Sequence, residues 1–378
     1  MENKVSKIWT YCLLVAAILV MAVSVCLVGA KDKEVAVAVV GDISGPLASF
    51  GNDNLQGVQI AADEINAAGG INGVKIVLKV FDEKNDPVEA VKIAQRIGDE
   101  CVAAILGSGS GPALATGPYY ERAGIPFLLT TSSNPKATSS GWKYVSRVQL
   151  DDPGQIRRLT EYVVKKLRIT KIALLYDTTD FGIGSRDAMV KIFQERGDVK
   201  LTTTEAWKVT DIDFGTQILN AQRSGAQAIW TIGVGDGCAK IVKQANSMGV
   251  KVQFLGNTSI GNQKFLDLAA GTAEGMTITW GAVDLKNPRV LEIDRKMRER
   301  YSRTIDVFVA HAYDAMYILA EAMKKAGTTT ANRPAIQEAI RAGSYNYSLG
   351  PLSFDKTGHN IRHIYIAKIV KGKFEIVD

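Results

Sequence analysis

A loop rich in glycine and serine, Gly107–Pro112, lies between a predicted strand and a predicted helix. Unpaired backbone N–H groups and the helix dipole at such a place favour a bound anion such as a carboxylate. Pro112 stands where a dinucleotide-binding loop needs its third glycine, and the loop lacks the Lys-Ser/Thr pair of a phosphate loop. Neither Ser108 nor Ser110 has the flanking glycines of a nucleophile elbow. Ser110 is therefore either a carboxylate contact or simply the N-cap of the helix.

Two further polar loops also follow predicted strands. Thr130–Pro135 offers five hydrogen-bonding side chains, which either face a ligand or form a solvated turn. Gly233–Gly237 carries Asp236, which is either a ligand-binding carboxylate or an acidic residue in the first turn of a helix. Cys238 occupies the last place of the dinucleotide pattern, so this loop also fails that test.

The sequence predicts neither catalysis nor a metal site. His359 and His363 are four residues apart, but the sequence predicts a strand over residues 361–369, where this spacing does not pair side chains as it does on a helix. No acidic or cysteine ligands cluster near them. No Ser/His/Asp set or pair of catalytic carboxylates stands out. We expect no enzyme activity, no cofactor and no metal.

Length and composition are those of a two-domain globular protein. The chain has 378 residues, of which 46% are hydrophobic and 22% charged, and its formal net charge is +6. No run of five or more Lys/Arg residues occurs, so no nucleic-acid partner is expected.

The first thirty residues resemble a secretory signal peptide. Lys4 and Lys7 precede a nearly continuous apolar stretch, residues 11–28, and small residues up to Ala30 follow it. We expect cleavage near Ala30 and a periplasmic location. The alternatives are a membrane anchor and a lipid-modified Cys26, although Val25 stands where the latter needs a small residue.

Cysteine usage after the predicted cleavage site is sparse. Only Cys101 and Cys238 remain, one at the start of a predicted strand and the other near a helix start in the other half of the chain. An oxidising compartment would permit a disulfide. We instead expect two free, mostly buried thiols.

The elements that position these loops alternate between strand and helix. Buried apolar runs such as 35–40 and 102–106 are typical of parallel strands, and amphipathic stretches such as 54–68 of the helices between them. This pattern predicts an α/β fold with two doubly wound, Rossmann-like lobes. An eight-unit barrel is the alternative, but the late succession of helices at 288–301, 307–326 and 334–342 argues against it. Ligands bind beyond the carboxyl ends of such strands, where the polar loops lie.

Several short motifs resemble, in order and spacing, the leucine/isoleucine/valine-binding protein family. These are the type I periplasmic solute-binding proteins of branched-chain amino acid ABC importers. The resemblance covers residues 34–370 and begins with Gly41-Asp42-Ile43-Ser44-Gly45-Pro46. The other motifs are Phe50-Gly51, 57–73, Asp86-Pro87, Gly124-Ile125-Pro126, Tyr176-Asp177, Phe181-Gly182, Gly249-Val250 and Gly350-Pro351-Leu352.

The resemblance implies two α/β lobes joined by three hinge strands and closing on a ligand between them. The chain would cross between the lobes near Asp151, Ala282 and Ser353. Lobe 1 would then comprise residues 31–151 plus 283–352, and lobe 2 residues 152–282 plus 353–378.

The resemblance also implies specific ligand contacts. The positions that bind the ligand carboxylate in the family match Ser110, Thr131 and Ser133. The aromatic residues that flank the ligand match Phe50 and Phe181, with Phe308 a looser match.

One position departs from the family pattern. Amino-acid binders usually have an acidic residue after the strand 253–255, pairing with the ligand ammonium, but this chain has Thr258 there. A buried ammonium without a charged partner is costly. Either Asp236 replaces the missing group, or the ligand is an aromatic, aliphatic or hydroxy acid without an amine.

The function implied is that of an extracytoplasmic solute-binding subunit. It would capture an amino acid or a related small carboxylate and deliver it, as a monomer, to the permease and ATPase of an ABC importer. The alternatives are a binding protein that senses aromatic or aliphatic carboxylates for a separate receptor, and a secreted hydrolase.

Overall fold

The computed structural model describes residues 33–234, 236–281 and 286–378. The predicted signal peptide, with Cys26 and Ala30, and the predicted crossing at Ala282 lie outside the described residues. No helix within the described ranges is long and apolar enough to span a bilayer.

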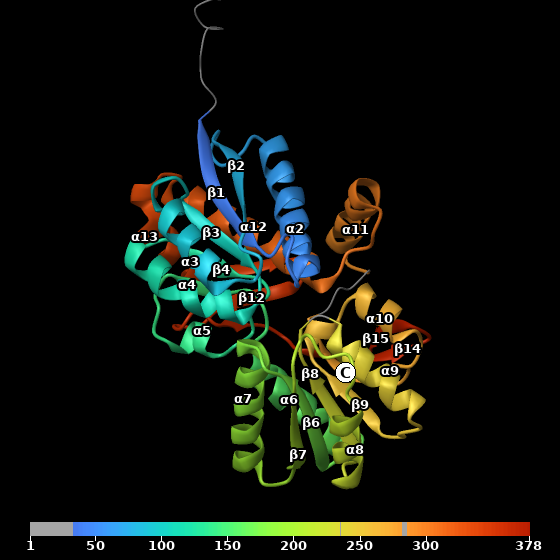
Figure 1. The fold of residues 1–378 in the computed structure, drawn as a ribbon. Coiled ribbons are helices and arrows are strands. Elements are labelled where there is room, and N and C mark those ends of the chain that lie inside the picture. Colours follow the sequence, from blue (N-terminus) through green and yellow to red (C-terminus); the bar gives the residue numbers. More distant parts are fainter. Residues whose placement is uncertain (1–32, 235, 282–285) are drawn as a thin grey trace, which may run out of the picture.

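Two separate sheets form two lobes, and each lobe has helices on both faces (Figure 1). The lobe 1 sheet has the order β2-β1-β3-β4-β5 and is parallel throughout. Its elements are β1 (Glu34–Gly41), α2 (Ala48–Ala67), β2 (Lys75–Asp82), α3 (Pro87–Arg96), η1 (Ile97–Asp99), β3 (Ala103–Gly107), α4 (Ser110–Ala123), β4 (Phe127–Leu129), α5 (Lys136–Ser139) and β5 (Val145–Arg147).

The lobe 2 sheet has the order β15-β14-β10-β9-β8-β6-β7, and its two C-terminal strands run antiparallel to their neighbours. Its parallel part follows the same winding as lobe 1. The elements of this part are α6 (Asp152–Lys165), β6 (Lys171–Asp177), α7 (Asp180–Arg196), β7 (Lys200–Trp207), α8 (Gly215–Arg223), β8 (Ala228–Ile232), α9 (Gly237–Ser247), β9 (Gln253–Gly256), η2 (Thr258–Ile260), α10 (Gln263–Ala269) and β10 (Thr277–Trp280).

The C-terminal part of the chain serves both lobes. Its elements are α11 (Pro288–Tyr301), α12 (Val307–Ala326), η3 (Thr330–Asn332), α13 (Arg333–Ala342), β11 (Ser344–Tyr347), β12 (Gly350–Phe354), β13 (Asn360–Ile361), β14 (Tyr365–Val370) and β15 (Lys373–Ile376). Helix α12 packs along α2 in lobe 1, whereas β14 and β15 complete the sheet of lobe 2.

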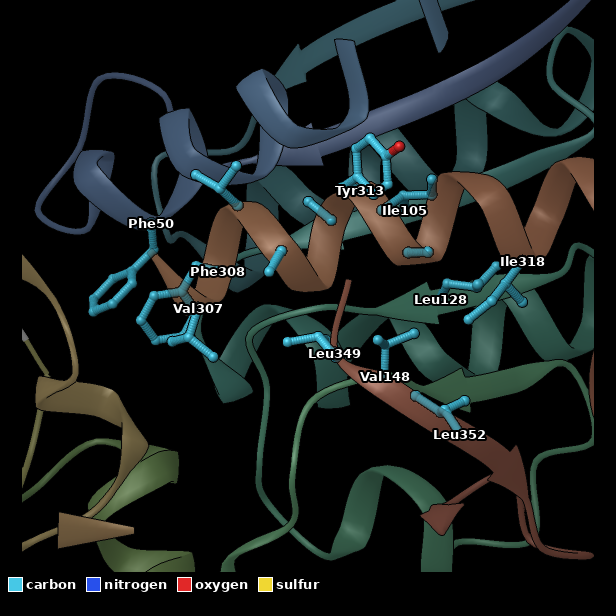
Figure 2. Packing of buried hydrophobic residues seen from close by; sticks show 14 of the residues in the cluster. Phe50, Ile105, Leu128, Val148, Val307, Phe308, Tyr313, Ile318, Leu349 and Leu352 are labelled. Atoms are coloured by element: carbon cyan, nitrogen blue, oxygen red, sulfur yellow. The ribbon is translucent and has the colours of Figure 1, made fainter. Parts of the chain in front are cut away.

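Side chains along β1 point alternately to the two faces of its sheet, and both sets are apolar, so both faces are covered by helices. Val37 and Val39 pack in the cluster that contains α2 and α12, whereas Ala38 and Val40 face the cluster formed by α3 and α4. This is the pattern of a strand buried on both faces. Figure 2 shows the first of these clusters, which extends along α12 to Phe308 and Phe50 at one end.

The third passage between the lobes differs from its predicted place near Ser353. Strands β11, β12 and β13 form a small antiparallel sheet, which the apolar pattern did not predict. His359 still bridges to Arg147 of lobe 1. The chain therefore reaches lobe 2 through residues 362–364, just before β14, about ten residues later than expected.

Candidate ligand-binding site

A cavity of about 430 Å³ lies between the two lobes. It is at the carboxyl ends of β1 and β3 in lobe 1 and of β6 and β8 in lobe 2, where the strand order reverses in each sheet. Its wall consists of Leu47, Phe50, Ser108, Gly109, Ser110, Thr131, Ser133, Gln149, Gln155, Phe181, Val234, Asn257, Ser259 and Phe308. None of these side chains is charged.

Five of the seven predicted site residues lie on this wall: Ser110, Thr131, Ser133, Phe50 and Phe181. The looser candidate, Phe308, lies there too, and its ring meets that of Phe50 edge to face with centroids 4.7 Å apart. The structure thus brings together the first turns of α2, α4, α7 and α12 and the segment that follows β4.

The first turn of α4 presents donors to the cavity. Gly109 is the N-cap, and Ser110 is the first helical residue, so the interpretation of Ser110 as an N-cap is wrong. Because glycine has no side chain to cap the helix, the first N–H groups of α4 have no partner among the described residues. The Ser110 hydroxyl is buried and accepts a hydrogen bond from Ser132 at 3.2 Å. Its own proton remains available to a ligand.

Thr131 contributes its backbone more than its hydroxyl. The hydroxyl donates to the carbonyl of Ser108 and holds the two loops of lobe 1 together. The backbone N–H groups of Thr131 and Ser133 donate to no group in the described parts of the chain. Since both residues line the cavity, these two N–H groups are further candidate donors to a ligand.

Two predicted residues do not line the cavity. The Thr258 hydroxyl is fully buried and donates to the carbonyl of Thr279 at 3.2 Å. The Asp236 carboxylate lies 2.8 Å from Lys264 Nζ. Asp236 lines a separate hollow of about 300 Å³ that also touches Phe50 and Ser259.

Equivalent carboxylates organise the two halves of the wall. Asp42 follows β1 and accepts from the N–H groups of Gly45 at 2.5 Å and Leu47 at 2.6 Å. Asp177 ends β6 and accepts from the N–H of Val234 at 2.7 Å. Burial raises the pKa of Asp177, and these hydrogen bonds oppose that rise. Both carboxylates hold the loops in place and do not face a ligand.

The chain was compared with known families and proteins. The family model described as periplasmic binding protein matches residues 34–373. This chain belongs to the periplasmic binding protein family.

Among curated relatives of this periplasmic binding protein is the leucine-, isoleucine-, valine-, threonine- and alanine-binding protein of Pseudomonas aeruginosa. It is 26% identical over 326 residues, which cover 85% of this chain and 86% of the relative. The branched-chain amino acid transporter substrate binding protein LivJ from Streptococcus pneumoniae, solved with isoleucine, has a TM-score of 0.82 at 25% identity, covering 91% of this chain and 99% of that one.

A solute binding protein of an ABC transporter from R. palustris, solved with benzoate, has a TM-score of 0.83 at 18% identity, covering 91% of this chain and 96% of that one. This likeness concerns the fold alone. Family membership makes the chain an extracytoplasmic solute-binding protein and not an enzyme, as the sequence predicted.

The sequence did not reveal three amide side chains on the wall of this periplasmic binding protein. Gln149 and Gln155 flank the first passage between the lobes, and Asn257 precedes Thr258. The available signals were that Gln149 and Gln155 lie close to the predicted crossing at Asp151, and that Asn257 directly precedes the predicted site residue Thr258. Nothing in the sequence alone showed which of their atoms would face the cavity.

Proposed function

We propose that this protein captures a small organic carboxylate, an amino acid or a related acid, and delivers it to the permease and ATPase of an ABC importer. The lobes close around the ligand, and the ligand favours closure only by binding the closed state more tightly. We also propose that residues 1–30 direct export and are removed near Ala30, leaving a periplasmic protein.

The observation that carries the proposal is that hydrogen-bond donors and apolar side chains line the same cavity. We assign the carboxylate to Ser110, Thr131 and Ser133. Unpaired N–H groups at a helix start stabilise negative charge without a cationic side chain. Phe50 and Phe181 would enclose the apolar body of the ligand. The names of relatives that mention leucine and isoleucine support a ligand about as large as these amino acids.

The test is thermal unfolding of the purified, exported protein with matched pairs of ligands. Each small acid, amino acids included, is compared with its amide, in which an uncharged CONH₂ group replaces the carboxylate. An acid at a hundred times its dissociation constant should stabilise the protein by about 2.7 kcal/mol. That corresponds to a rise of roughly 5–11 °C in the unfolding temperature of a domain of about 150–250 residues. Equal shifts for acids and amides, or no shift with any acid, would contradict the proposal.

A further inference from the structure

We propose that the ligand carries no amine: the site is built for a carboxylate with an apolar body and a further hydrogen-bond acceptor, such as a 2-oxo or 2-hydroxy acid. This inference rests on the proposed function, because it assumes that the cavity between the lobes is the ligand site. It concerns which chemical class of carboxylate enters that site.

The orientation of each wall amide is fixed by a backbone N–H group. Gln149 Oε1 accepts from the N–H of Leu150 at 2.7 Å. Gln155 Oε1 accepts from the N–H of Thr258 at 3.0 Å and also from the Thr279 hydroxyl at 2.8 Å. Since a backbone N–H can only donate, the atom that it meets must be the amide oxygen and not the nitrogen.

Asn257 follows the same rule. Its Oδ1 accepts from the N–H of Ser259 at 3.3 Å and from the Ser259 hydroxyl at 2.6 Å. The oxygens of all three wall amides are therefore engaged within the protein.

The amide nitrogens are what remain for a ligand. The NH₂ groups of Gln149 and Asn257 donate to no acceptor in the described parts of the chain, and that of Gln155 makes one long contact, 3.4 Å, to the carbonyl of Leu150. An NH₂ group meets carboxylate, keto or hydroxyl oxygens favourably. It repels an ammonium group, which has only donors.

None of the described residues that line the cavity is acidic. Asp42 and Asp177 hold backbone N–H groups, and Asp236 pairs with Lys264 outside the cavity. Asp152 is buried but does not line the cavity, and Asp180 lies in solvent at its mouth. An ammonium group enclosed here would lose its hydration without a compensating charge.

The apolar part of the wall defines the rest of the ligand. Leu47, Phe50, Phe181, Val234 and Phe308 line the cavity, and all five side chains are nearly inaccessible to water. A branched aliphatic or aromatic body gains most from such surroundings.

Calorimetric titration of the purified, exported protein with acids of one carbon skeleton tests the inference. The series is leucine, 4-methyl-2-oxopentanoate and 2-hydroxy-4-methylpentanoate, with phenylalanine and phenylpyruvate as an aromatic pair. We expect the oxo or hydroxy acid to bind at least about a hundredfold more tightly than its amino acid. Equal or tighter binding of the amino acid would overturn the inference and leave the proposed function intact. If none of the acids binds detectably, the proposed function is overturned as well.

An isosteric variant gives an independent test. Asn257→Asp keeps the oxygen that Ser259 needs and replaces the NH₂ group with a charged oxygen. It should weaken binding of the oxo or hydroxy acid by about a hundredfold and strengthen binding of the amino acid. Unchanged preference would overturn the inference. If Asn257→Asp fails to fold, Gln149→Glu makes the same exchange on lobe 1.

Asp236→Asn is the matched control. Because Asp236 pairs with Lys264 outside the cavity, its substitution should leave the preference unchanged. Amino-acid binding that is lost in Asp236→Asn would identify Asp236 as an ammonium partner and overturn the inference.

Discussion

The side-chain amide of Asn134 in lobe 1 donates a hydrogen bond to the backbone carbonyl of Asp180 in lobe 2, at 2.7 Å. Asp180 opens helix α7 and also lines the hollow at the mouth of the ligand cavity. The contact therefore exists only while the lobes are together. It joins them without touching the ligand site itself.

Removing this contact should weaken ligand binding without altering the cavity. We expect Asn134→Ala to raise the dissociation constant about fivefold, since a typical hydrogen bond contributes about 1 kcal/mol net. Most of the change should appear as faster ligand release, which stopped-flow measurements can follow. Asn246→Ala, on an exposed helix end remote from the cavity, is the control. A dissociation constant unchanged from that control would show that the contact does not stabilise closure.

Closure also depends on the absence of a side chain at Gly184. A Cβ atom there would lie 2.4 Å from Asn134 Nδ2, too close for both to keep their places. Gly184→Ala should therefore hold the lobes slightly apart, weaken binding and enlarge the radius of gyration of the liganded protein in small-angle scattering. Gly98→Ala is the control, because a Cβ atom there meets nothing closer than 4.0 Å. A liganded Gly184→Ala protein as compact as the unsubstituted one would contradict this account.

Ser110 should be important for the carboxylate. Ser110→Ala removes one hydroxyl donor to a charged group, a loss of about 1.5–3 kcal/mol. We expect affinity for the acid ligand to fall roughly tenfold to a hundredfold, measured by calorimetry. Ser139→Ala, at an exposed position on α5, should leave affinity unchanged. If both variants bind alike, the assignment of the carboxylate to the start of α4 is wrong.

Asp152 should make stability depend on pH. It is buried at the first passage between the lobes, and burial raises its pKa to about 7. The Ser133 and Ser185 hydroxyls oppose this rise, although neither forms a hydrogen bond of ordinary geometry with it. Because the folded state holds this proton more tightly than the unfolded state, stability is greatest below the unfolded pKa near 4 and falls as pH rises toward 7.

Asp152→Asn replaces the carboxyl group with an amide that does not titrate, so this contribution to the pH dependence of stability is lost. Between pH 5 and 7 the free energy of unfolding of the variant should fall less steeply than that of the original protein, by about 1.4 kcal/mol per pH unit. Urea unfolding at several pH values measures both slopes. Parallel slopes would mean that Asp152 does not bind a proton in this range.

The sequence predicted long helices well and helix starts beside the cavity poorly. The expected ranges 288–301 and 307–326 coincide with α11 and α12. By contrast, α2 begins at Ala48, whereas Asn54 was expected. Gly51 makes the reason clear: it packs against the backbone of Asp42, where a Cβ atom would lie 1.9 Å from the carbonyl oxygen. Because the first turn of such a helix contains residues that are typical of loops, the sequence pattern placed the helix start too late.

Side-chain direction explains the difference between the predicted and observed walls. A residue after a strand can face the cavity or the sheet, and tertiary contacts decide which. The Thr258 hydroxyl turns inward because the carbonyl of Thr279 accepts its hydrogen bond, whereas its neighbours Asn257 and Ser259 line the cavity. Position along the chain therefore identified the loop that lines the cavity but not which of its residues do so.

The buried, free thiols of Cys101 and Cys238 agree with the prediction, because the apolar residues around each cysteine in the sequence indicated buried surroundings.

The anchored amide oxygens also bear on how ligand choice can evolve. A Gln or Asn codon becomes a Glu or Asp codon by a single base change. At Gln149, Gln155 or Asn257 such a mutation would preserve the oxygen that the neighbouring N–H requires. A lineage of such proteins could therefore gain or lose amine-bearing nutrients in one mutational step, with the scaffold untouched.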